Sequence, residues 1–311
     1  MQLIDDKTDF TAFMAEPEGQ QKVRRAGSYT DEVIRRFTSP EEQQGVCLPW
    51  GKTRHQFRIR PNELTLWPGI NGHGKSLVLN QVMLHAMARG ERALIASMEM
   101  PPVKTLERMA RQAIGTSSPT PEAIREFSTW TDGRLWIYDH LGSVQWRKLL
   151  AVMRYAAKEI GITQFVVDSM MRCGIGETDY DGQKEFIDAL CTFRMDYPVH
   201  VHLVAHSRKR EDEYALPGKF DLKGSGSITD LADNVVTTWR NKRKEAAMQQ
   251  AHYQRSKADV TVFDQPDAML IVDKQRHGEW EGRVALWFLP GSMQFVERGD
   301  ISTPMSVMDG V

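Results

Sequence analysis

Short apolar runs alternate with apolar residues at helical spacing over the first two thirds of the chain. Five runs have the length and the polar flanks of buried strands: residues 63–67, 92–97, 135–138, 164–168 and 199–205. The segments between them repeat apolar side chains every three to four residues, which predicts helices over residues 76–89, 103–113, 144–159 and 183–195. Strands that alternate with helices favour parallel pairing, right-handed crossovers and a sheet covered on both faces.

The pattern changes after Ala205. A polar segment, Ser207–Ser227, is followed by an apolar run at 235–239 and by a charged helical stretch at 240–253. Two further strands are expected at 269–272 and 284–288, and their close spacing favours antiparallel pairing. The predicted fold is therefore an α/β domain with a mostly parallel central sheet, flanking helices and late antiparallel strands.

The first forty residues are polar apart from one short amphipathic helix expected at Thr30–Phe37, where Val33, Ile34 and Phe37 share a face. A helix of this length cannot bury an apolar face alone, so it is expected to dock on its own domain, to fray, or to dock on a neighbouring subunit. The expected organisation is an N-terminal segment (1–45), one α/β domain (46–300) and a flexible C-terminal tail (301–311).

Composition narrows the class of protein. A chain of 311 residues with 41% hydrophobic residues supports a sizeable core, and a formal net charge of −1 excludes a globally basic protein. Any nucleic-acid contact must then come from local clusters. The three cysteines, Cys47, Cys173 and Cys191, lack paired spacing, which argues against a zinc module and favours a reducing compartment. No apolar run is long enough to span a bilayer, and the start of the chain, with acidic Asp5 and Asp6, does not resemble a targeting peptide, so a cytoplasmic protein is predicted.

The stretch from Gly69 to Ser76 matches the P-loop pattern G-x-x-x-x-G-K-[ST] at every fixed position, between a predicted strand and a predicted helix. In such a loop, backbone N–H groups surround phosphate oxygens, a lysine reaches the β- and γ-phosphates and a hydroxyl binds Mg²⁺. Those last two residues would be Lys75 and Ser76. The loop residues expected to bind nucleotide are Gly69, Asn71, Gly72, His73, Gly74, Lys75 and Ser76.

Three polar residues end or follow predicted strands where a parallel sheet meets its ligand. Asp168 is placed to hold the metal or its water shell, or alternatively caps the next turn. Glu99 precedes two prolines and could orient an attacking water, or alternatively it is a favourable acid at a helix start. His206 could contact the γ-phosphate, although a lone histidine is more often structural.

Two basic regions could contact phosphate. The Ser207–Ser227 segment begins with Arg208 and Lys209 and ends with Lys223, Gly224, Ser225 and Gly226, a composition that fits a mobile DNA-binding loop or an ordinary solvated loop. Lys274 and Arg276 follow a late strand as a candidate phosphate clamp, with a bland surface turn as the alternative. Arg240, at the end of the 235–239 strand, is a weaker candidate of the same kind.

Taken in order, these motifs resemble the RecA-like helicase domain of the DnaB/Twinkle superfamily, especially the helicase half of phage primase–helicases. The resemblance covers about Val46 to Arg298 and rests on GINGHGKS, ASMEMPP, QFVVDS, HLVAHSRK, DLKGSGSITDLADNVVTTWRNK and IVDKQRHGEWEG. It implies a Walker B role for Asp168, a catalytic base at Glu99 and a γ-phosphate sensor at His206. It also implies DNA contacts from Arg208, Lys209 and the Lys223–Gly226 region, an arginine finger at Arg276 with Lys274 beside it, and a possible phosphate contact from Arg240.

The resemblance further implies a head-to-tail homo-hexameric ring around single-stranded DNA, driven by ATP or another NTP or dNTP with Mg²⁺ and travelling 5′ to 3′. The Thr30–Phe37 helix would be a linker helix packed on the neighbouring protomer. No primase or zinc module precedes the domain, so a separate primase, polymerase or loader is expected. Two other functions stay open: a RecA/RadA-like recombination ATPase, and a nucleotide-switched loading or assembly factor that does not unwind DNA.

Overall fold

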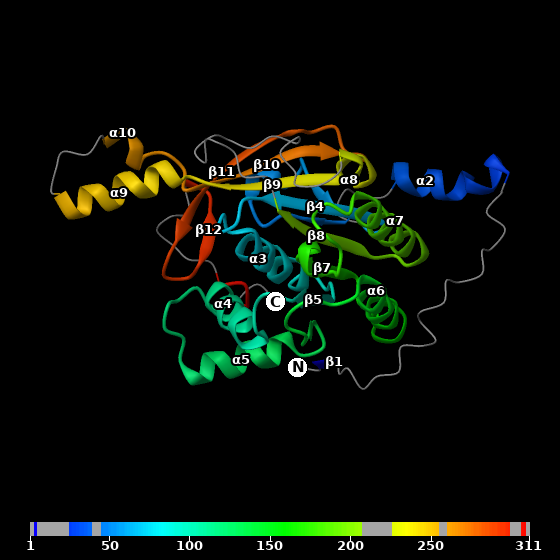
Figure 1. The fold of residues 1–311 in the computed structure, drawn as a ribbon, viewed down its shortest axis with the longest axis horizontal. Coiled ribbons are helices and arrows are strands. Elements are labelled where there is room, and N and C mark those ends of the chain that lie inside the picture. Colours follow the sequence, from blue (N-terminus) through cyan, green and yellow to red (C-terminus); the bar gives the residue numbers. More distant parts are fainter. Residues whose placement is uncertain are drawn as a thin grey trace.

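A ten-stranded sheet runs through the part of the molecule that the structure describes and carries helices on both faces (Figure 1). The structure is a computed structural model, and it describes residues 3–4, 25–38, 45–206, 226–254, 260–298 and 306–308. The strand order is β1-β6-β5-β7-β8-β4-β9-β10-β11-β12. Pairing is parallel from β1 to β9 and antiparallel from β9 to β12.

The strands confirm the predicted α/β fold with its late antiparallel strands. Their bounds are β1 Leu3–Ile4, β4 Glu63–Gly69, β5 Ala93–Ser97, β6 Leu135–Tyr138, β7 Gln164–Asp168, β8 His200–His206, β9 Asn234–Arg240, β10 Ala268–Gln275, β11 Gly282–Leu289 and β12 Gln294–Val296. A separate two-stranded sheet pairs β2 (Val46–Cys47) with β3 (Arg58–Ile59). The sequence analysis did not predict β1, β2, β3 or β12, because strands of two or three residues carry too little periodicity.

The helices agree less well at their ends. They are α2 Thr30–Thr38, α3 Lys75–Met87, α4 Pro102–Ile114, α5 Pro121–Thr131, α6 Trp146–Tyr155, α7 Tyr180–Asp196, α8 Gly226–Leu231, α9 Lys242–Gln254 and α10 Val260–Phe263. The helix expected over 144–159 is α6 followed by a π-helical turn, Ala156–Ile160. Helix α7 begins three residues before its expected start, because the Asp179 carboxylate accepts a hydrogen bond from Gly182 N at 2.9 Å.

Helix α5 was not predicted. Thr120 is its N-cap residue, since Thr120 Oγ1 accepts a hydrogen bond from Ala123 N at 3.2 Å, and Pro121 occupies the first helical position. The polar residues on its outer face obscured the helical period. Helix α8 was also missed, because it begins inside the segment expected to be a loop.

The two faces of the sheet bury different residues of the same strands. In β4, Leu64 and Leu66 belong to a core cluster that includes residues of α6 and α7, whereas Trp67 packs in a second cluster that includes residues of α3 and α4. This is the period-two alternation of a strand that is covered on both sides. Each such side chain contributes roughly 1.5–3 kcal/mol by leaving water, so both helical layers fix the sheet that carries the polar strand ends.

The strand directions place the predicted site residues at two edges of the sheet. Strand β4 ends at Gly69, and β9 runs parallel to it and ends at Arg240, so both reach the same edge. Strand β10 runs the other way. Its first residue, Ala268, pairs with Arg240, and its last, Gln275, pairs with Asn234 at the opposite edge.

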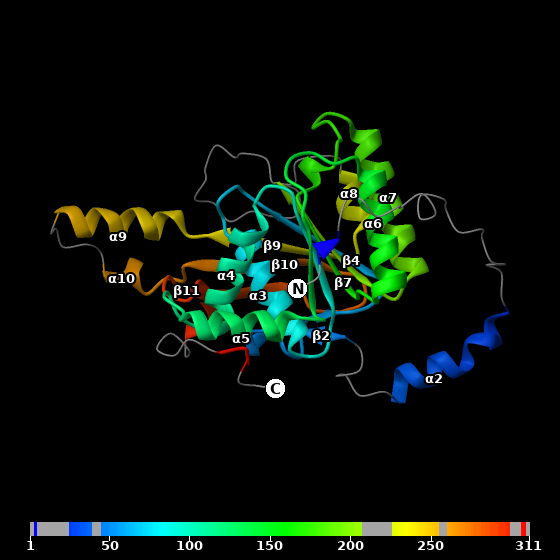
Figure 2. The same ribbon diagram turned by 90° about the horizontal axis from the view of Figure 1, so that it is seen from below.

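Two elements extend beyond the sheet and its covering helices. Helices α9 and α10 project at one end of the molecule, and α2 stands apart at the other end (Figures 1 and 2). The predicted apolar face of α2 is open to solvent, with Val33 49%, Ile34 52% and Phe37 87% exposed. Among the described residues, the structure contains no helix of sufficient length and apolar character to cross a membrane.

Candidate functional site

The P-loop connects the carboxyl end of β4 to the first turn of α3. Gly72 and Gly74 have φ values of 80° and 83°, a left-handed conformation that favours glycine. Gly69 serves a different purpose, because a Cβ there would lie 2.8 Å from the carbonyl oxygen of Thr238 on β9. These glycines let the loop curl closely over the sheet edge, with the N-terminus of α3 at its base, which is the cradle a triphosphate requires.

Lys75 and Ser76 point into the same small region as Asp168. The ammonium of Lys75 donates hydrogen bonds to Gly69 O at 2.8 Å and to Ile70 O at 3.1 Å, and the side chain is buried. Burial lowers the pKa of Lys75 to about 8, against the opposing influence of the Asp168 and Glu99 carboxylates. Ser76 Oγ donates to Asp168 Oδ2 at 2.5 Å. Burial is the main cause that raises the pKa of Asp168, and the Ser76 hydrogen bond opposes it.

The oxygen atoms of Ser76 and Asp168 form a donor set that fits Mg²⁺, a hard cation that prefers oxygen ligands and is often held by few protein groups together with substrate phosphates. The structure thus brings together four predicted residues at one edge: Lys75, Ser76, Asp168 and Glu99.

Arg240 lies against the P-loop from β9. Its backbone N–H donates to His73 Nδ1 at 3.1 Å and its guanidinium donates to Gly72 O at 3.3 Å. Burial, followed by the nearby cations Lys242, Lys75 and Arg240, lowers the pKa of His73 to about 4, so the ring is neutral and can accept this bond. Glu245 in the first turn of α9 pairs with both Arg240 and Lys242. The loop and β9 are thereby joined at the predicted Arg240 position.

Glu99 and His206 meet at the same edge through a residue that the sequence analysis did not single out. Ser169, directly after Asp168, has its Oγ 3.1 Å from Glu99 Oε1 and 3.2 Å from His206 Nε2. Arg172 also approaches Glu99, with 3.5 Å between Nε and Oε1. The strand order β5-β7-β8 brings these side chains together, because Glu99, Ser169 and His206 follow or end three adjacent strands.

Lys274 and Arg276 do not join this cluster. Lys274 is within β10 and Arg276 follows it, at the edge of the sheet opposite the P-loop. Asn234 and Arg240 are six residue steps apart along β9, which at about 3.3 Å per step is roughly 20 Å. Lys274 Nζ donates to Thr229 O at 2.9 Å, and Arg276 Nη2 donates to Asp230 O at 2.9 Å. Both side chains thus bind carbonyls in the last turn of α8.

The proposed DNA-binding residues can be placed only in part. Gly226 is the first residue of α8. The other residues of that prediction lie outside the described part of the chain: Arg208, Lys209, Lys223, Gly224 and Ser225. Sequence reasoning also missed Ser169, Arg172, Asp233 and Glu245. Ser169 adjoins Asp168 and could have been found by position, but nothing local marks Asp233, whose partners come from other elements.

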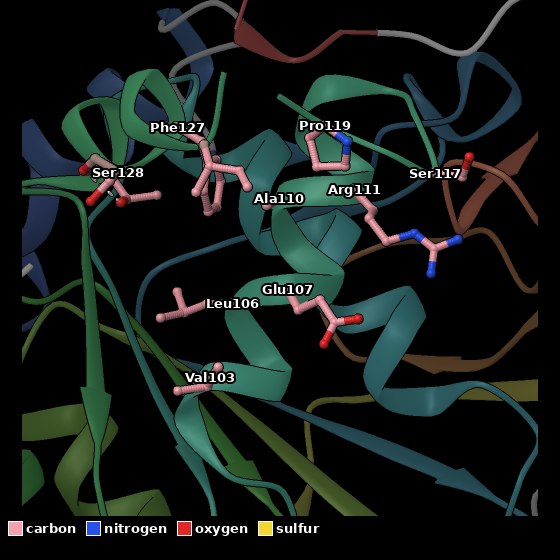
Figure 3. A pocket seen from close by; sticks show the side chains of 11 residues that line it. Val103, Leu106, Glu107, Ala110, Arg111, Ser117, Pro119, Phe127 and Ser128 are labelled. Carbon is pink, nitrogen blue, oxygen red and sulfur yellow. Dashed lines mark hydrogen bonds between the residues drawn. The ribbon is translucent and has the colours of Figure 1, made fainter. Parts of the chain in front are cut away.

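An apolar groove lies away from these strand ends, between α4 and α5 (Figure 3). Its volume is about 510 Å³, and its walls include Leu106, Ala110 and Phe127. Two further lining residues are exposed hydrophobics, Val103 at 74% and Ile124 at 45%. The P-loop site is polar and this groove is apolar, so the two surfaces suit different kinds of partner.

The mostly parallel sheet with a P-loop after β4, an acid ending β7 and a polar residue ending β8 defines a RecA-like P-loop nucleotide-binding domain. The model of the DnaB-like helicase C terminal domain family matches residues 58–297, so the chain belongs to that family. The recognition made from the ordered motifs is confirmed.

Curated relatives agree at low identity. The Twinkle homolog protein, chloroplastic/mitochondrial, of Arabidopsis thaliana is 23% identical over 232 residues, which cover 66% of this chain and 32% of that protein. The DNA helicase/primase of Enterobacteria phage T3 is 24% identical over 251 residues, 73% of this chain and 44% of that protein. The chain therefore spans less than half the length of these curated relatives.

Solved structures confirm the fold. The ATPase domain of G40P has a TM-score of 0.69 at 14% identity, and the match covers 88% of this chain and 99% of that one. A DnaB-like replicative helicase, solved in a study of its interactions with primase, also has a TM-score of 0.69, at 13% identity, with 88% of this chain and 68% of that one covered.

Proposed function

We propose that this chain is the motor domain of a ring-forming DNA helicase that hydrolyses NTP and travels on single-stranded DNA. The observation that carries the proposal is the distance between two groups of residues, which we call half-sites: the P-loop with its neighbours, and the pair Lys274 and Arg276. The P-loop lies at one edge of the sheet, and Lys274 and Arg276 lie roughly 20 Å away at the other edge. A basic pair that cannot reach its own P-loop can serve that of a second copy, as head-to-tail contacts allow.

The chemistry proposed for the first half-site follows from its residues. The P-loop backbone and Lys75 bind the triphosphate, and Ser76 and Asp168 hold Mg²⁺. Bound there, Mg²⁺ would neutralise charge on the phosphate oxygens. Glu99 orients the attacking water and accepts its proton. Arg240, held against Gly72, adds a phosphate contact.

The second half-site would complete the reaction from the neighbouring copy. Arg276 is proposed to stabilise the charge that develops at the γ-phosphate, an effect on the order of 10³ to 10⁵ in turnover where such fingers are known. Lys274 accompanies it. His206 ends β8, immediately before the segment that contains Arg208 and Lys209, and is proposed to pass the state of the nucleotide to the Lys223–Gly226 region, which grips DNA.

The proposed assembly is a homo-hexamer around DNA, with travel in the 5′-to-3′ direction. Helix α2 would be the linker that docks on the next copy, where the groove between α4 and α5 offers an apolar surface for Val33, Ile34 and Phe37. The phage T3 relative is named as a helicase and a primase, and one structural neighbour was studied with primase. A separate primase is therefore part of the proposal as a partner. A polymerase or a loader as partner, and a location in the host cytoplasm, are proposed from the resemblance to phage helicases.

Unwinding of a forked duplex tests the proposal. We expect the wild type to hydrolyse NTP faster with single-stranded DNA and to displace a strand. Lys75→Ala and Arg276→Ala should do neither, whereas Lys104→Ala, an exposed lysine on α4, should behave as wild type. A wild-type protein that hydrolyses NTP with DNA stimulation yet never separates strands would leave the loading factor as the better description.

The recombination ATPase is separated by shape. Particles formed with nucleotide and single-stranded DNA should be closed rings when imaged by electron microscopy. Filaments along the DNA, together with strand exchange, would favour the RecA/RadA-like function instead.

A further inference from the structure

The hydroxyl of Ser169 lies between two residues that are proposed to take part in hydrolysis. Ser169 is fully buried, and its Oγ lies 3.1 Å from Glu99 Oε1 and 3.2 Å from His206 Nε2. The direct distance from His206 Nε2 to Glu99 Oε1 is 3.8 Å, which is too long for a hydrogen bond. Ser169 is therefore the bridge between Glu99 and His206.

The bridge has a direction. A serine hydroxyl has one hydrogen to donate, and at Ser169 it goes to the Glu99 carboxylate, which accepts. The same oxygen must then accept at its contact with His206, so His206 Nε2 carries the hydrogen. The chain of donors runs from His206 through Ser169 to Glu99, and each end depends on the position of the other.

A second group near Glu99 holds it less firmly. Arg172 Nε lies 3.5 Å from the same Oε1 atom, but the Arg172 and Glu99 side chains are 47% and 40% exposed. An ion pair with this exposure contributes roughly 0–1 kcal/mol, because water screens it and both side chains lose freedom. The buried hydroxyl, not the arginine, fixes where the carboxylate of Glu99 points.

We infer that Ser169 is a positioning residue, which orients the Glu99 carboxylate toward its water according to the position of His206. The inference rests on the proposed function. His206 is the last residue of β8, directly before the Arg208–Lys209 pair that is proposed to contact DNA, so a shift of His206 would reach Glu99 through one hydroxyl. DNA binding and the catalytic base are linked by this route.

The test measures NTP hydrolysis with and without single-stranded DNA for Ser169→Ala and Ser169→Thr. Removal of the hydroxyl should lower kcat with DNA by about tenfold and leave KM and nucleotide Kd within about twofold, since the Ser169 hydroxyl contacts Glu99 and His206 and is not among the residues proposed to bind nucleotide. Threonine keeps the hydroxyl and should keep kcat within about threefold. Thr192→Val, which removes an exposed hydroxyl on α7 away from the P-loop site, is the matched control and should equal wild type.

A double-mutant cycle with His206 tests the bridge itself. If the two residues act through one chain, Ser169→Ala combined with His206→Ala should lower kcat no further than the more damaging single change. Independent effects that multiply would contradict the bridge. Ser169→Cys replaces the alanine variant if circular dichroism shows that alanine does not fold, and it should also lower kcat because a thiol is a weak donor.

The outcomes separate this inference from the proposed function. If the wild type shows no stimulation by DNA, the proposed function fails. The role of Ser169 is then tested on kcat without DNA, which should fall about tenfold in Ser169→Ala and stay within about threefold in Ser169→Thr. If the wild type is stimulated and Ser169→Ala retains that rate within twofold, only the inference fails. A tenfold rise in Kd with unchanged kcat would likewise overturn it, because Ser169 would then act in nucleotide binding.

Discussion

Asp233 and Arg276 form an ion pair at the edge of the sheet opposite the P-loop, with 3.4 Å between Oδ1 and Nη1. The carboxylate of Asp233 is buried, and it also accepts a hydrogen bond from Leu64 N at 2.8 Å and pairs with Arg194 at 3.1 Å. The side chain of Arg276, in contrast, is 42% exposed. The buried carboxylate of Asp233, which is hydrogen-bonded to the start of β4, thus holds the partly exposed side chain of Arg276.

Asp233→Asn should weaken turnover without weakening nucleotide binding. The amide keeps an acceptor for Leu64 N but removes the charge that holds Arg276, so we expect kcat to fall by about tenfold with Kd within about twofold. The thermal midpoint should also fall, because Arg194 keeps a buried charge without its partner. Asp264→Asn, at an exposed acid, is the control. If kcat is unchanged in the folded variant, Asp233 does not position Arg276 for hydrolysis.

Mixing two inactive variants tests whether Arg276 acts on a second copy. Arg276→Ala lacks the finger, and Glu99→Gln lacks the base but supplies a finger, so mixed assemblies contain some interfaces with both groups intact. NTP hydrolysis of the mixture should therefore exceed that of either variant alone. If it does not, fluorescence exchange between labelled subunits distinguishes a failure to mix from a failure of the trans assignment.

Acid should destabilise the domain between about pH 6.5 and pH 4. Burial lowers the pKa of His200 to about 4, so the folded protein binds fewer protons than the unfolded chain in this window. Stability thus rises with pH through the window and is lost as pH falls. We expect His200 alone to reduce the free energy of unfolding by on the order of 1 kcal/mol between pH 7 and pH 5.

Urea unfolding at several pH values measures this loss. His200→Gln should flatten the pH dependence between pH 7 and pH 5, while His55→Gln, at an exposed histidine, should leave it unchanged. His73 and His202 have lowered pKa values for the same main cause, so part of the dependence should remain in His200→Gln. An identical slope in wild type and His200→Gln would contradict the assignment.

Charges placed on α2 or in the α4–α5 groove should weaken assembly and spare the fold. Val33 and Ile124 are 49% and 45% exposed, so Val33→Asp and Ile124→Asp should change the free energy of unfolding by about 0.5 kcal/mol or less. If α2 docks in the groove, either change should shift sedimentation toward smaller species. Met195→Asp, at a residue of α7 that is 66% exposed, controls for added charge. Intact assembly in both variants would exclude this contact.

The fold could be predicted largely from the sequence because its strands are buried on both faces. The runs that became β6 and β7 carry apolar side chains at nearly every position, bounded by polar residues, and their ends were found without error. Helix α5 escaped prediction because only Phe127 and Thr131 are buried on it. A helix with so narrow a contact gives too weak a period to separate from a polar loop.

Candidate site residues could be named from the sequence where one segment carries the signal. The P-loop is one contiguous segment, and all the residues that define its pattern lie within eight positions of one another. Ser169 and Asp233 depend on what lies across the sheet: Glu99 and His206 meet Ser169 only because β7 is between β5 and β8. Strand order is a property of the whole chain, and no local pattern gives it.

The opposite direction of β9 and β10 has a consequence for counting. If Arg276 completes a neighbour's P-loop, one isolated copy contains no working centre, and an open chain of n copies contains n − 1. Closure of the ring adds the last one. The rate of NTP hydrolysis per copy would then rise with the number of copies in the assembly and become constant once the ring closes. Measured at increasing protein concentration, this rate shows how the copies are connected.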